Sequence, residues 1–342
     1  MTGLLWTWAK DHASDGPAKS ALAVRDLRLQ AHLTRLWEVL ESCVACLAEA
    51  GIEVATLKGV TAESRWYERR GERPCADVDL WLSPHQLDRA GDALRLLQPD
   101  HPWVPFFGAF AVSGRVQTVT LKRDGIEVDL HLDLFKTGLE TRQPAQIWSA
   151  TMSFDLPGGT VVRVLDPHTA LVNLLIHLNK DRFQRLLGYA DVARLISRYP
   201  VDWREIFRRA AGEGLETVVA CSMEAVVADL GLEWPPDLPR PFGWQAAAWR
   251  VIWRPAIRLR GTEGRVRFRA RQQLIPFLTT GGTSAAAKSV LREAFPPAQT
   301  VDIRYKDLRG PYLWKLVQGR SLAKRRAQEQ LRALRGVDAG AL

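Results

Sequence analysis

Apolar residues in the first half of the chain recur first at helical and then at alternating spacing. Residues 27–50 carry leucine and valine three or four positions apart, and Gly51, a residue typical of helix C-termini, follows them. Residues 77–82 and 126–134 instead alternate apolar and polar side chains, which predicts strands with one apolar face each. The pattern therefore predicts an α+β first half.

Shorter segments complete the predicted elements. The dipeptide Asp124-Gly125 predicts a hairpin that joins the strand at 126–134 to an earlier strand at 116–122. From Pro167 onwards only helical spacing remains, and the proline-rich segment 234–239 is expected to interrupt the helices. The remaining predicted strands cover residues 52–57 and 160–165, and the helices cover 61–70, 84–97, 167–179, 183–199, 203–212, 215–230 and 322–334.

Composition narrows the class of protein. The chain has 342 residues, 46% of them hydrophobic and 25% charged, which excludes a disordered or fibrous chain. No apolar run approaches the ~20 residues of a membrane span, and no signal peptide is evident. Four cysteines make no disulfide framework, and Cys43 and Cys46 are interpreted as buried thiols rather than as a metal or redox pair. We therefore expect a cytoplasmic protein without a membrane span.

Charge is unevenly distributed along the chain. From Arg240 to the end there are 21 basic and 6 acidic side chains, a net charge of +15, whereas the preceding part carries −6. A solvated helical surface explains such a region most simply. It could also face a nucleotide, a nucleic acid, an acidic peptide or the acidic body of the chain itself.

Carboxylates gather on the polar faces of two predicted strands. Asp77 and Asp79 share one face of their strand, and Asp129 lies on the polar face of the later one. An acidic, solvent-exposed strand face is the simpler interpretation of each strand alone. On neighbouring strands, however, stacked carboxylates repel each other unless a cation lies between them. Together they indicate an oxygen-ligand site for Mg²⁺, of the kind that can hold two ions.

A glycine turn precedes these strands. Gly59 follows a predicted strand and opens a predicted helix, where backbone N–H groups can meet a phosphate, and Lys58 adds a positive charge. An isolated Lys-Gly pair is more often a plain turn. The order in which the turn and the carboxylates occur favours the functional interpretation.

That order resembles the nucleotidyltransferase fold shared with polymerase β. More closely, the chain resembles the family of uncharacterised bacterial nucleotidyltransferases, over roughly residues 33–320. Two departures are Val60, where the superfamily has a second glycine or a serine, and a longer stretch between Gly59 and Asp77. The motifs that carry the resemblance are Leu57-Lys58-Gly59, Arg73, Asp77-Val78-Asp79-Leu80 and Val128-Asp129-Leu130-His131.

The resemblance implies a polymerase β-like mixed sheet with flanking helices, followed by an all-helical C-terminal region. It also implies a division of the chain into parts. These are an N-terminal extension over 1–25, a catalytic domain over 26–166, a helical domain over 167–239 and a basic Arg- and Trp-rich region over 240–342.

The resemblance further implies a Mg²⁺-dependent transfer of a nucleoside monophosphate from an NTP, with ATP as the expected donor, to an acceptor. Asp77 and Asp79 would hold an ion on the triphosphate. Asp129 would help to hold a second ion and draw the proton from the acceptor, with release of pyrophosphate. Lys58 and Arg73 are the candidate contacts to the phosphate tail; either could equally be a surface cation.

Three further residues are candidates for the acceptor side or for orienting a carboxylate: His131, His177 and Lys180. For the two histidines a hydrogen-bonded packing role is the simpler interpretation. The acceptor could be a small molecule, a peptide or a protein, as in natural-product tailoring.

Two other functions compete with nucleotidyl transfer. A degenerate transferase could bind nucleic acid or a partner protein through its basic C-terminal region, although no nucleic-acid-binding signature is present and nucleic acid is not favoured. Intact Asp77, Asp79 and Asp129 argue against degeneration. A phosphotransferase ranks last because its nucleotide-binding motifs are lacking.

Overall fold

A computed structural model of the chain divides it into two compact units, Met1–Ala286 and Ala287–Leu342. It describes residues 2–12, 14–97, 118–123, 125–135, 141–181, 183, 185–241, 243–258, 295, 308–315, 317–319 and 321. Of the second unit this includes residue 295 and residues 308–315, 317–319 and 321, which hold a short helical segment. The helix predicted over 322–334 lies outside the described residues. The predicted four-part division is finer than these two units and stays a prediction.

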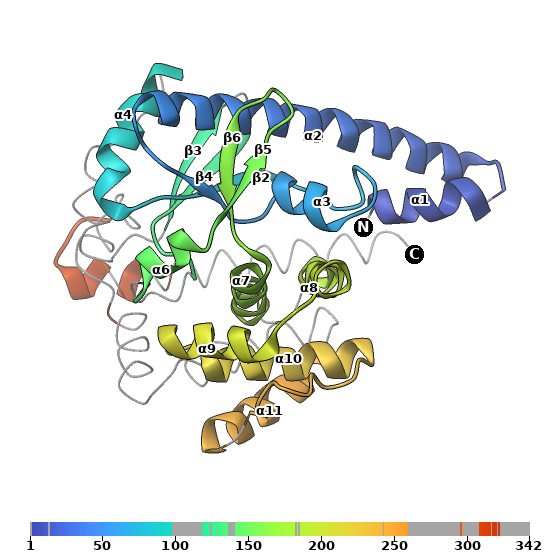
Figure 1. The fold of residues 1–342 in the computed structure, drawn as a ribbon, viewed down its shortest axis with the longest axis vertical. Coiled ribbons are helices and arrows are strands. Elements are labelled where there is room, and N and C mark those ends of the chain that lie inside the picture. Colours follow the sequence, from blue (N-terminus) through green and yellow to red (C-terminus); the bar gives the residue numbers. More distant parts are fainter. Residues whose placement is uncertain are drawn as a thin grey trace. The chain divides into compact units, whose positions relative to one another are not determined.

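A mixed six-stranded sheet forms the centre of the first unit, with the strand order β3-β4-β2-β1-β6-β5 (Figure 1). Strands β2 and β4 are parallel, as are β1 and β6, while the other three neighbouring pairs are antiparallel. The strands are β1 (Ala55–Thr56), β2 (Asp77–Trp81), β3 (Thr118–Arg123), β4 (Ile126–His131), β5 (Met152–Asp155) and β6 (Val161–Val164). The predicted mixed sheet and the hairpin β3–β4 are confirmed.

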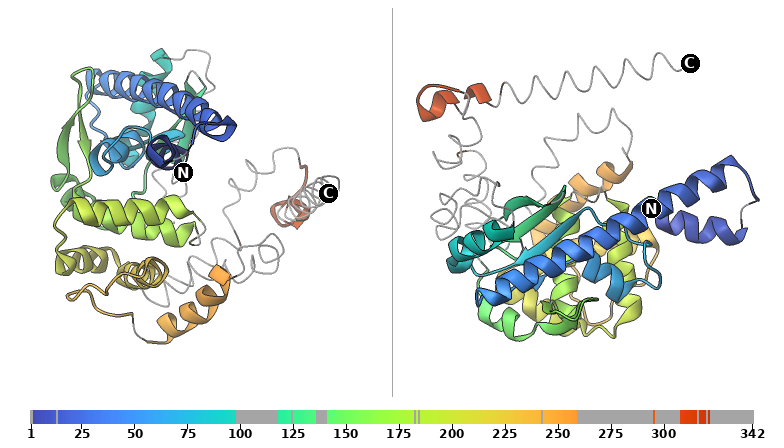
Figure 2. Two further views of the ribbon diagram at one scale, coloured as in Figure 1. Left: turned by 90° about the vertical axis from the view of Figure 1, so that its right-hand side faces the viewer. Right: turned by 90° about the horizontal axis from the view of Figure 1, so that it is seen from above.

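Helices α2 (Pro17–Glu49) and α4 (Leu87–Leu97) cover one face of this sheet. Helix α2 begins ten residues before the predicted start, and α1 (Thr2–His12) lies beside its first turns (Figure 2). A short 3₁₀ helix, η1 (Pro84–Gln86), precedes α4. The apolar positions of the alternating strands pack into this layer, as the sequence predicts: Val78, Leu80, Leu82, Ile126, Val128 and Leu130.

The opposite face of the sheet is covered as well. Trp81, two residues after Asp79 at the end of β2, packs against Trp148 of α6 with ring centroids 5.2 Å apart. Helices α7 and α8 lie nearest to the sheet, and α9, α10 and α11 follow beyond them (Figures 1 and 2). The helices of this layer are α6 (Pro144–Ser149), α7 (Pro167–Lys180), α8 (Leu186–Arg198), α9 (Trp203–Glu213), α10 (Glu216–Leu230) and α11 (Gly243–Arg258). On the polar faces of β2 and β4, Asp79 and His131 are therefore enclosed, whereas Asp129 is half-buried and Glu127 is exposed.

Local sequence signals explain where the central helices begin and end. Asp166 accepts hydrogen bonds from the backbone N–H groups of His168 and Thr169 at the start of α7. Asp202 likewise accepts from the backbone N–H groups of Arg204 and Glu205 at the start of α9. Gly214 and Gly231 end α9 and α10 with positive φ. The Arg209 guanidinium, 2.7 Å from the Asp166 carboxylate, then fixes α9 against the start of α7.

Two short elements were not predicted from the sequence. Strand β5 has four residues, and its edge position is defined by pairing with β6 rather than by its own pattern. Helix α6 has six residues and begins at Pro144. Such short segments carry too few periods for hydrophobic spacing to reveal them.

The interpretation of the cysteines as thiols agrees with the structure, in which Cys43, Cys46, Cys75 and Cys221 form no disulfide. Burial raises the pKa of Cys43 to about 11, so this thiol stays protonated at neutral pH.

Among the described helices, none combines the length and the apolar character needed to cross a membrane.

Helix α11 offers a test of packing in the helical layer. Trp249 is fully buried and meets Phe183 edge to face, with ring centroids 5.9 Å apart. We expect Trp249→Ala to lower the free energy of unfolding by about 3–5 kcal/mol, because it leaves a cavity. Urea unfolding followed by far-UV circular dichroism measures this change. Trp244 on the same helix is 57% exposed, and Trp244→Ala should cost less than about 0.5 kcal/mol. Equal losses in the two variants would contradict the assignment.

Candidate functional site

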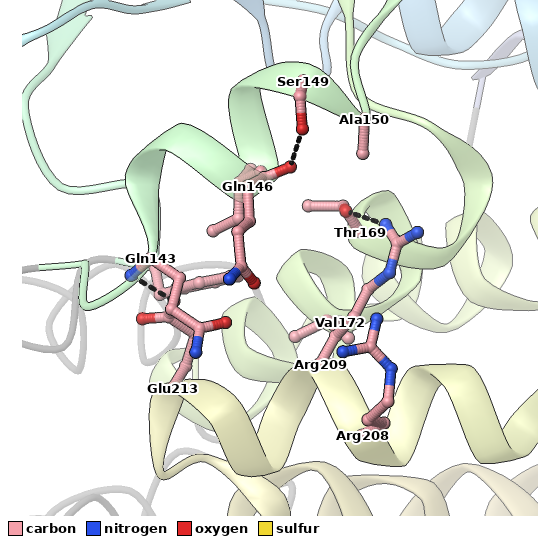
Figure 3. A pocket seen from close by; sticks show the side chains of 11 residues that line it. Gln143, Gln146, Ser149, Ala150, Thr169, Val172, Arg208, Arg209 and Glu213 are labelled. Atoms are coloured by element: carbon pink, nitrogen blue, oxygen red, sulfur yellow. Dashed lines mark hydrogen bonds between the residues drawn. The ribbon is translucent and has the colours of Figure 1, made fainter.

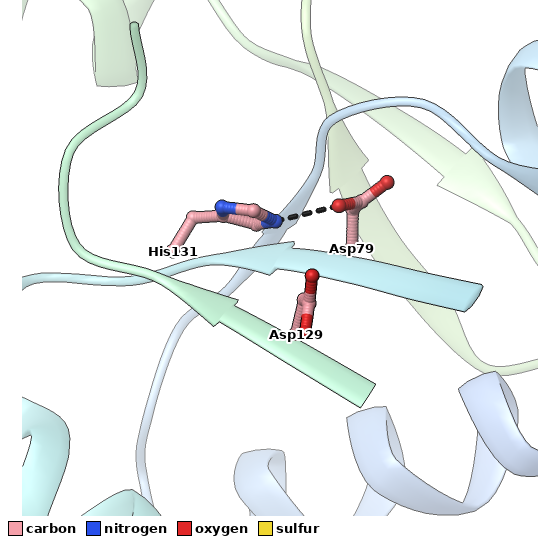
Figure 4. A group of neighbouring side chains, drawn as sticks. All are labelled: Asp79, Asp129 and His131. Atoms are coloured by element: carbon pink, nitrogen blue, oxygen red, sulfur yellow. Dashed lines mark hydrogen bonds and ion pairs between the residues drawn. The ribbon is translucent and has the colours of Figure 1, made fainter. Parts of the chain in front are cut away.

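The parallel pairing of β2 and β4 brings together the acidic residues of two distant motifs. Its register sets Asp79 opposite Asp129 and Trp81 opposite His131. Asp79, Asp129 and His131 each offer one ligand atom, and these atoms all lie within 4.8 Å of one another (Figure 4). We call these three residues the carboxylate cluster.

Asp79 is the most enclosed member of the carboxylate cluster. Its Oδ1 lies 2.6 Å from Nε2 of His131, and both side chains are inaccessible to solvent. Its Oδ2 lies 3.2 Å from the ammonium of Lys58. A buried carboxylate is costly unless it is paired, so these two partners stabilise Asp79 in its charged form and fix its orientation.

The pKa of Lys58 depends on its burial and on the carboxylates beside it. Burial alone would lower its pKa, but the nearby Asp79 and Asp77 outweigh this effect, and the pKa is raised above its ordinary value. The side chain therefore remains an ammonium at neutral pH. A permanent positive charge at the edge of the carboxylate cluster suits contact with a phosphate.

Asp129 is the more open carboxylate. It is half-buried, and its Oδ1 accepts a hydrogen bond of 2.6 Å from the Thr120 hydroxyl of the neighbouring strand β3. This contact orients the carboxylate while leaving the residue partly accessible. An accessible, oriented carboxylate beside an enclosed one is suited to proton transfer.

The other predicted site residues lie around this centre. Asp77 shares the strand face of Asp79, pairs in register with Glu127 and is outside the carboxylate cluster, although its charge reaches Lys58. Lys180 ends α7, and His177 lies three residues before it. The pKa of Lys180 is lowered by desolvation and by Lys58, against the attraction of Asp181, Asp133 and Asp79. Asp79 of the carboxylate cluster is thus one of the charges that act on Lys180.

The glycine turn lies against the start of β2. Gly59 has φ +72° and ψ −135°, a conformation that favours glycine. A Cβ at this position would lie 3.3 Å from the Asp77 carbonyl oxygen. The Thr61 hydroxyl donates a 3.1 Å hydrogen bond to the Lys58 carbonyl and so closes the turn. A glycine here lets the turn approach β2 and brings Lys58 to Asp79.

Arg73 does not turn towards the carboxylate cluster. Its guanidinium forms a two-point ion pair with Asp191 of α8, with distances of 2.8 and 2.9 Å, and the Arg73 side chain is 6% exposed. The phosphate-contact role predicted for Arg73 therefore finds no support in this geometry. Asp191 and its second partner, Tyr67, were not among the predicted site residues. A single acidic residue between buried positions of an amphipathic helix was the available signal.

A separate pocket of about 250 Å³ opens between α6, α7 and α9 (Figure 3). It shares no lining residue with the carboxylate cluster, and each of its charged side chains has a partner outside the lining or in the backbone. Arg208 and Arg209 both bind Glu205, and Glu213 accepts two backbone N–H bonds from the start of α6. These pairings satisfy the local charges, so we assign the chemistry to the carboxylate cluster.

The Lys58–Asp79 contact predicts how this site binds a cation. We expect Lys58→Met to bind Mn²⁺ in the absence of nucleotide about tenfold more tightly, because the negative charge of Asp79 and Asp129 is then less compensated. Calorimetric titration of Mn²⁺ measures the dissociation constant. Lys19→Met is the matched control. Lys19 lies on α2, and its Nζ is 3.0 Å from Oδ1 of the exposed Asp15, which precedes the helix. Unchanged or weaker Mn²⁺ binding by Lys58→Met would contradict the prediction.

Comparisons with known proteins bear on the family of this chain. Among solved structures, the chain is similar to an antigenic nucleotidyltransferase-like protein from Paracoccidioides brasiliensis. The identity is 12% and the TM-score 0.38, over 57% of this chain and 88% of that one. No curated protein matches the sequence. The model of a family described as uncharacterised nucleotidyltransferase matches residues 4–229, which hold both strands of the site, the glycine turn and Asp191. The chain belongs to this family of uncharacterised nucleotidyltransferases.

Proposed function

We propose that the protein transfers a nucleoside monophosphate from an NTP, with ATP as the expected donor, to an acceptor and releases pyrophosphate. The observation that carries this proposal is the register that sets Asp79 opposite Asp129, with Lys58 in contact with Asp79. Family membership adds the reaction class. The acceptor class stays open between a small molecule, a peptide and a protein.

The donor set of the carboxylate cluster fits a divalent cation. Two carboxylates and one imidazole come from adjacent strands, and the carboxylate oxygens suit Mg²⁺. The imidazole of His131 also suits Mn²⁺, which accepts nitrogen ligands more readily. Asp77, on the same strand face, would complete the predicted set of three aspartates. A divalent cation held there would neutralise the triphosphate and make its α-phosphorus more electrophilic.

Each residue of the site then has a defined task. Asp129 accepts the proton of the acceptor group as the acceptor oxygen attacks the α-phosphorus, and the bond to pyrophosphate breaks. His131 holds the Asp79 carboxylate in position by their 2.6 Å contact. Lys58 and the Gly59 turn bind the phosphate tail, where the ammonium offsets its negative charge. We assign Lys180 and His177 of α7 to the acceptor side, because the Lys180 ammonium interacts electrostatically with Asp79.

This assignment predicts the behaviour of two isosteric variants. We expect Asp79→Asn and Asp129→Asn each to lower the rate of pyrophosphate release by about 100-fold or more, since the first removes a cation ligand and the second a proton acceptor. Pyrophosphate is measured with Mg²⁺ and each NTP in turn, with cell extract supplying the unknown acceptor. Asp88→Asn, an exposed position on α4, controls for the loss of one carboxylate.

Three results would contradict the proposal. Release of phosphate or of nucleoside diphosphate instead of pyrophosphate would identify a phosphotransferase. Wild-type activity in both Asp79→Asn and Asp129→Asn would remove the carboxylate cluster from the reaction. If no NTP binds to the wild-type protein with Mg²⁺, a catalytically degenerate binding protein becomes the better description.

A further inference from the structure

A buried ion pair connects the helical layer to the loop that precedes β2. Nε and Nη2 of Arg73 lie 2.8 and 2.9 Å from the two carboxylate oxygens of Asp191 on α8. The Tyr67 hydroxyl donates a further hydrogen bond of 2.7 Å to Asp191 Oδ1. Both charged side chains are almost completely buried, 6% and 4% exposed. The planar, two-point geometry fixes the direction of the guanidinium.

The third nitrogen of the guanidinium reaches the glycine turn. Nη1 of Arg73 donates to the carbonyl oxygen of Gly59 at 3.3 Å and to Sγ of Cys75 at 3.2 Å. Gly59 directly follows Lys58, whose ammonium contacts Asp79. Cys75 lies two residues before Asp77, the first residue of β2. A single side chain therefore joins α8, the turn and the approach to the carboxylate strand.

The opposite side of the same loop is fastened separately. Glu63 of α3 (Val60–Trp66) accepts a hydrogen bond of 2.6 Å from the backbone N–H of Gly71. The segment that follows α3 is thus fixed to α3 at Gly71 and to α8 through Arg73. The Gly59 carbonyl accepts two hydrogen bonds, one of 3.0 Å from the backbone N–H of Glu63 in α3 and one of 3.3 Å from Arg73. The second of these links the turn to Asp191 of α8.

Stability alone is a weak reason for such a pair. Buried ion pairs cost desolvation of both charges, and apolar residues of similar size often replace them without loss of stability. What an apolar residue cannot reproduce is a donor aimed at the Gly59 carbonyl. The contact pattern points to positioning rather than to added stability.

We propose that Arg73 is a positioning residue that fixes the Lys58–Gly59 turn for the phosphate tail, and that Asp191 of the helical layer sets the direction of Arg73. The inference rests on the proposed function, because it assigns the turn to nucleotide binding. Through this pair the helical layer contributes to nucleotide affinity indirectly, because neither Arg73 nor Asp191 contacts the nucleotide.

The test is Arg73→Lys in the full-length protein. Lysine keeps the positive charge for Asp191 but cannot form the two-point pair and also donate to Gly59. We expect the dissociation constant of a non-hydrolysable ATP analogue with Mg²⁺, and the KM for the NTP, to rise about tenfold. The dissociation constant of Mn²⁺ alone should change less than about twofold, since the carboxylate cluster is untouched. Hydrogen exchange of the backbone amides of residues 58–63 should become faster.

Arg250→Lys is the matched control. Arg250 on α11 also forms a two-point pair, with Glu224 at 2.7 and 2.9 Å, and donates to a carbonyl, that of Pro241, at 2.9 Å. Arg250 thus also combines a two-point ion pair with a hydrogen bond to a carbonyl, but it does not touch the turn. We expect this variant to bind the ATP analogue as the wild type does and to leave exchange at residues 58–63 unchanged.

The outcomes separate this inference from the proposed function. Unchanged exchange at residues 58–63 in Arg73→Lys would overturn the positioning role whether or not the protein binds nucleotide. Faster exchange with unchanged affinity for the ATP analogue would overturn the link to the phosphate tail. Equal losses of analogue and Mn²⁺ binding would indicate general unfolding and also overturn the inference. If the wild type binds no analogue, the proposed function fails, and the link from the turn to nucleotide binding is overturned with it.

Discussion

The charge balance between β2 and β4 is the constraint on which the rest of this site depends. Parallel pairing sets two carboxylates side by side, of which Asp79 is enclosed and Asp129 is half-buried. Such an arrangement is stable only where positive or hydrogen-bonding groups compensate the buried charge. Lys58, His131 and Thr120 supply that compensation. Each of them also holds a carboxylate in a defined orientation, so that stability and chemistry share the same contacts.

A second consequence is that the two halves of the chain depend on each other. The sheet presents apolar residues to α2 and α4 and a mixed polar face to the helices that begin at α7. Trp81 and the pair Arg73–Asp191 cross this boundary. The helical layer therefore closes the polar side of the sheet and fastens the loop that leads into it. The predicted boundary at residue 166 therefore does not separate two cores, because buried residues from both sides of it pack into one hydrophobic cluster.

The proposed nucleotidyl transfer would account for the unequal environments of the carboxylates. A ligand for a cation benefits from rigidity and full enclosure, which Asp79 has. A proton acceptor needs access to the incoming group, which the half-buried Asp129 retains. In the proposed reaction, the ammonium of Lys58 would offset the negative charge of the phosphate tail. Asp79 and Asp129, to which the resemblance gives different tasks, thus also differ in their burial.

The alternating pattern of β2 and β4 by itself determined which faces are apolar, and the order of motifs determined the family. Local periodicity has a physical basis in side-chain direction, so the sequence alone suffices to put Asp79 and Asp129 on polar strand faces. The pairing Arg73–Asp191 spans 118 positions, and only the packing of α8 against the loop decided it. Tertiary structure alone also decided that Asp79 is enclosed while Asp129 is half-buried, and that β5 and α6 exist. Those features follow from contacts between distant segments, which no local pattern of residues encodes.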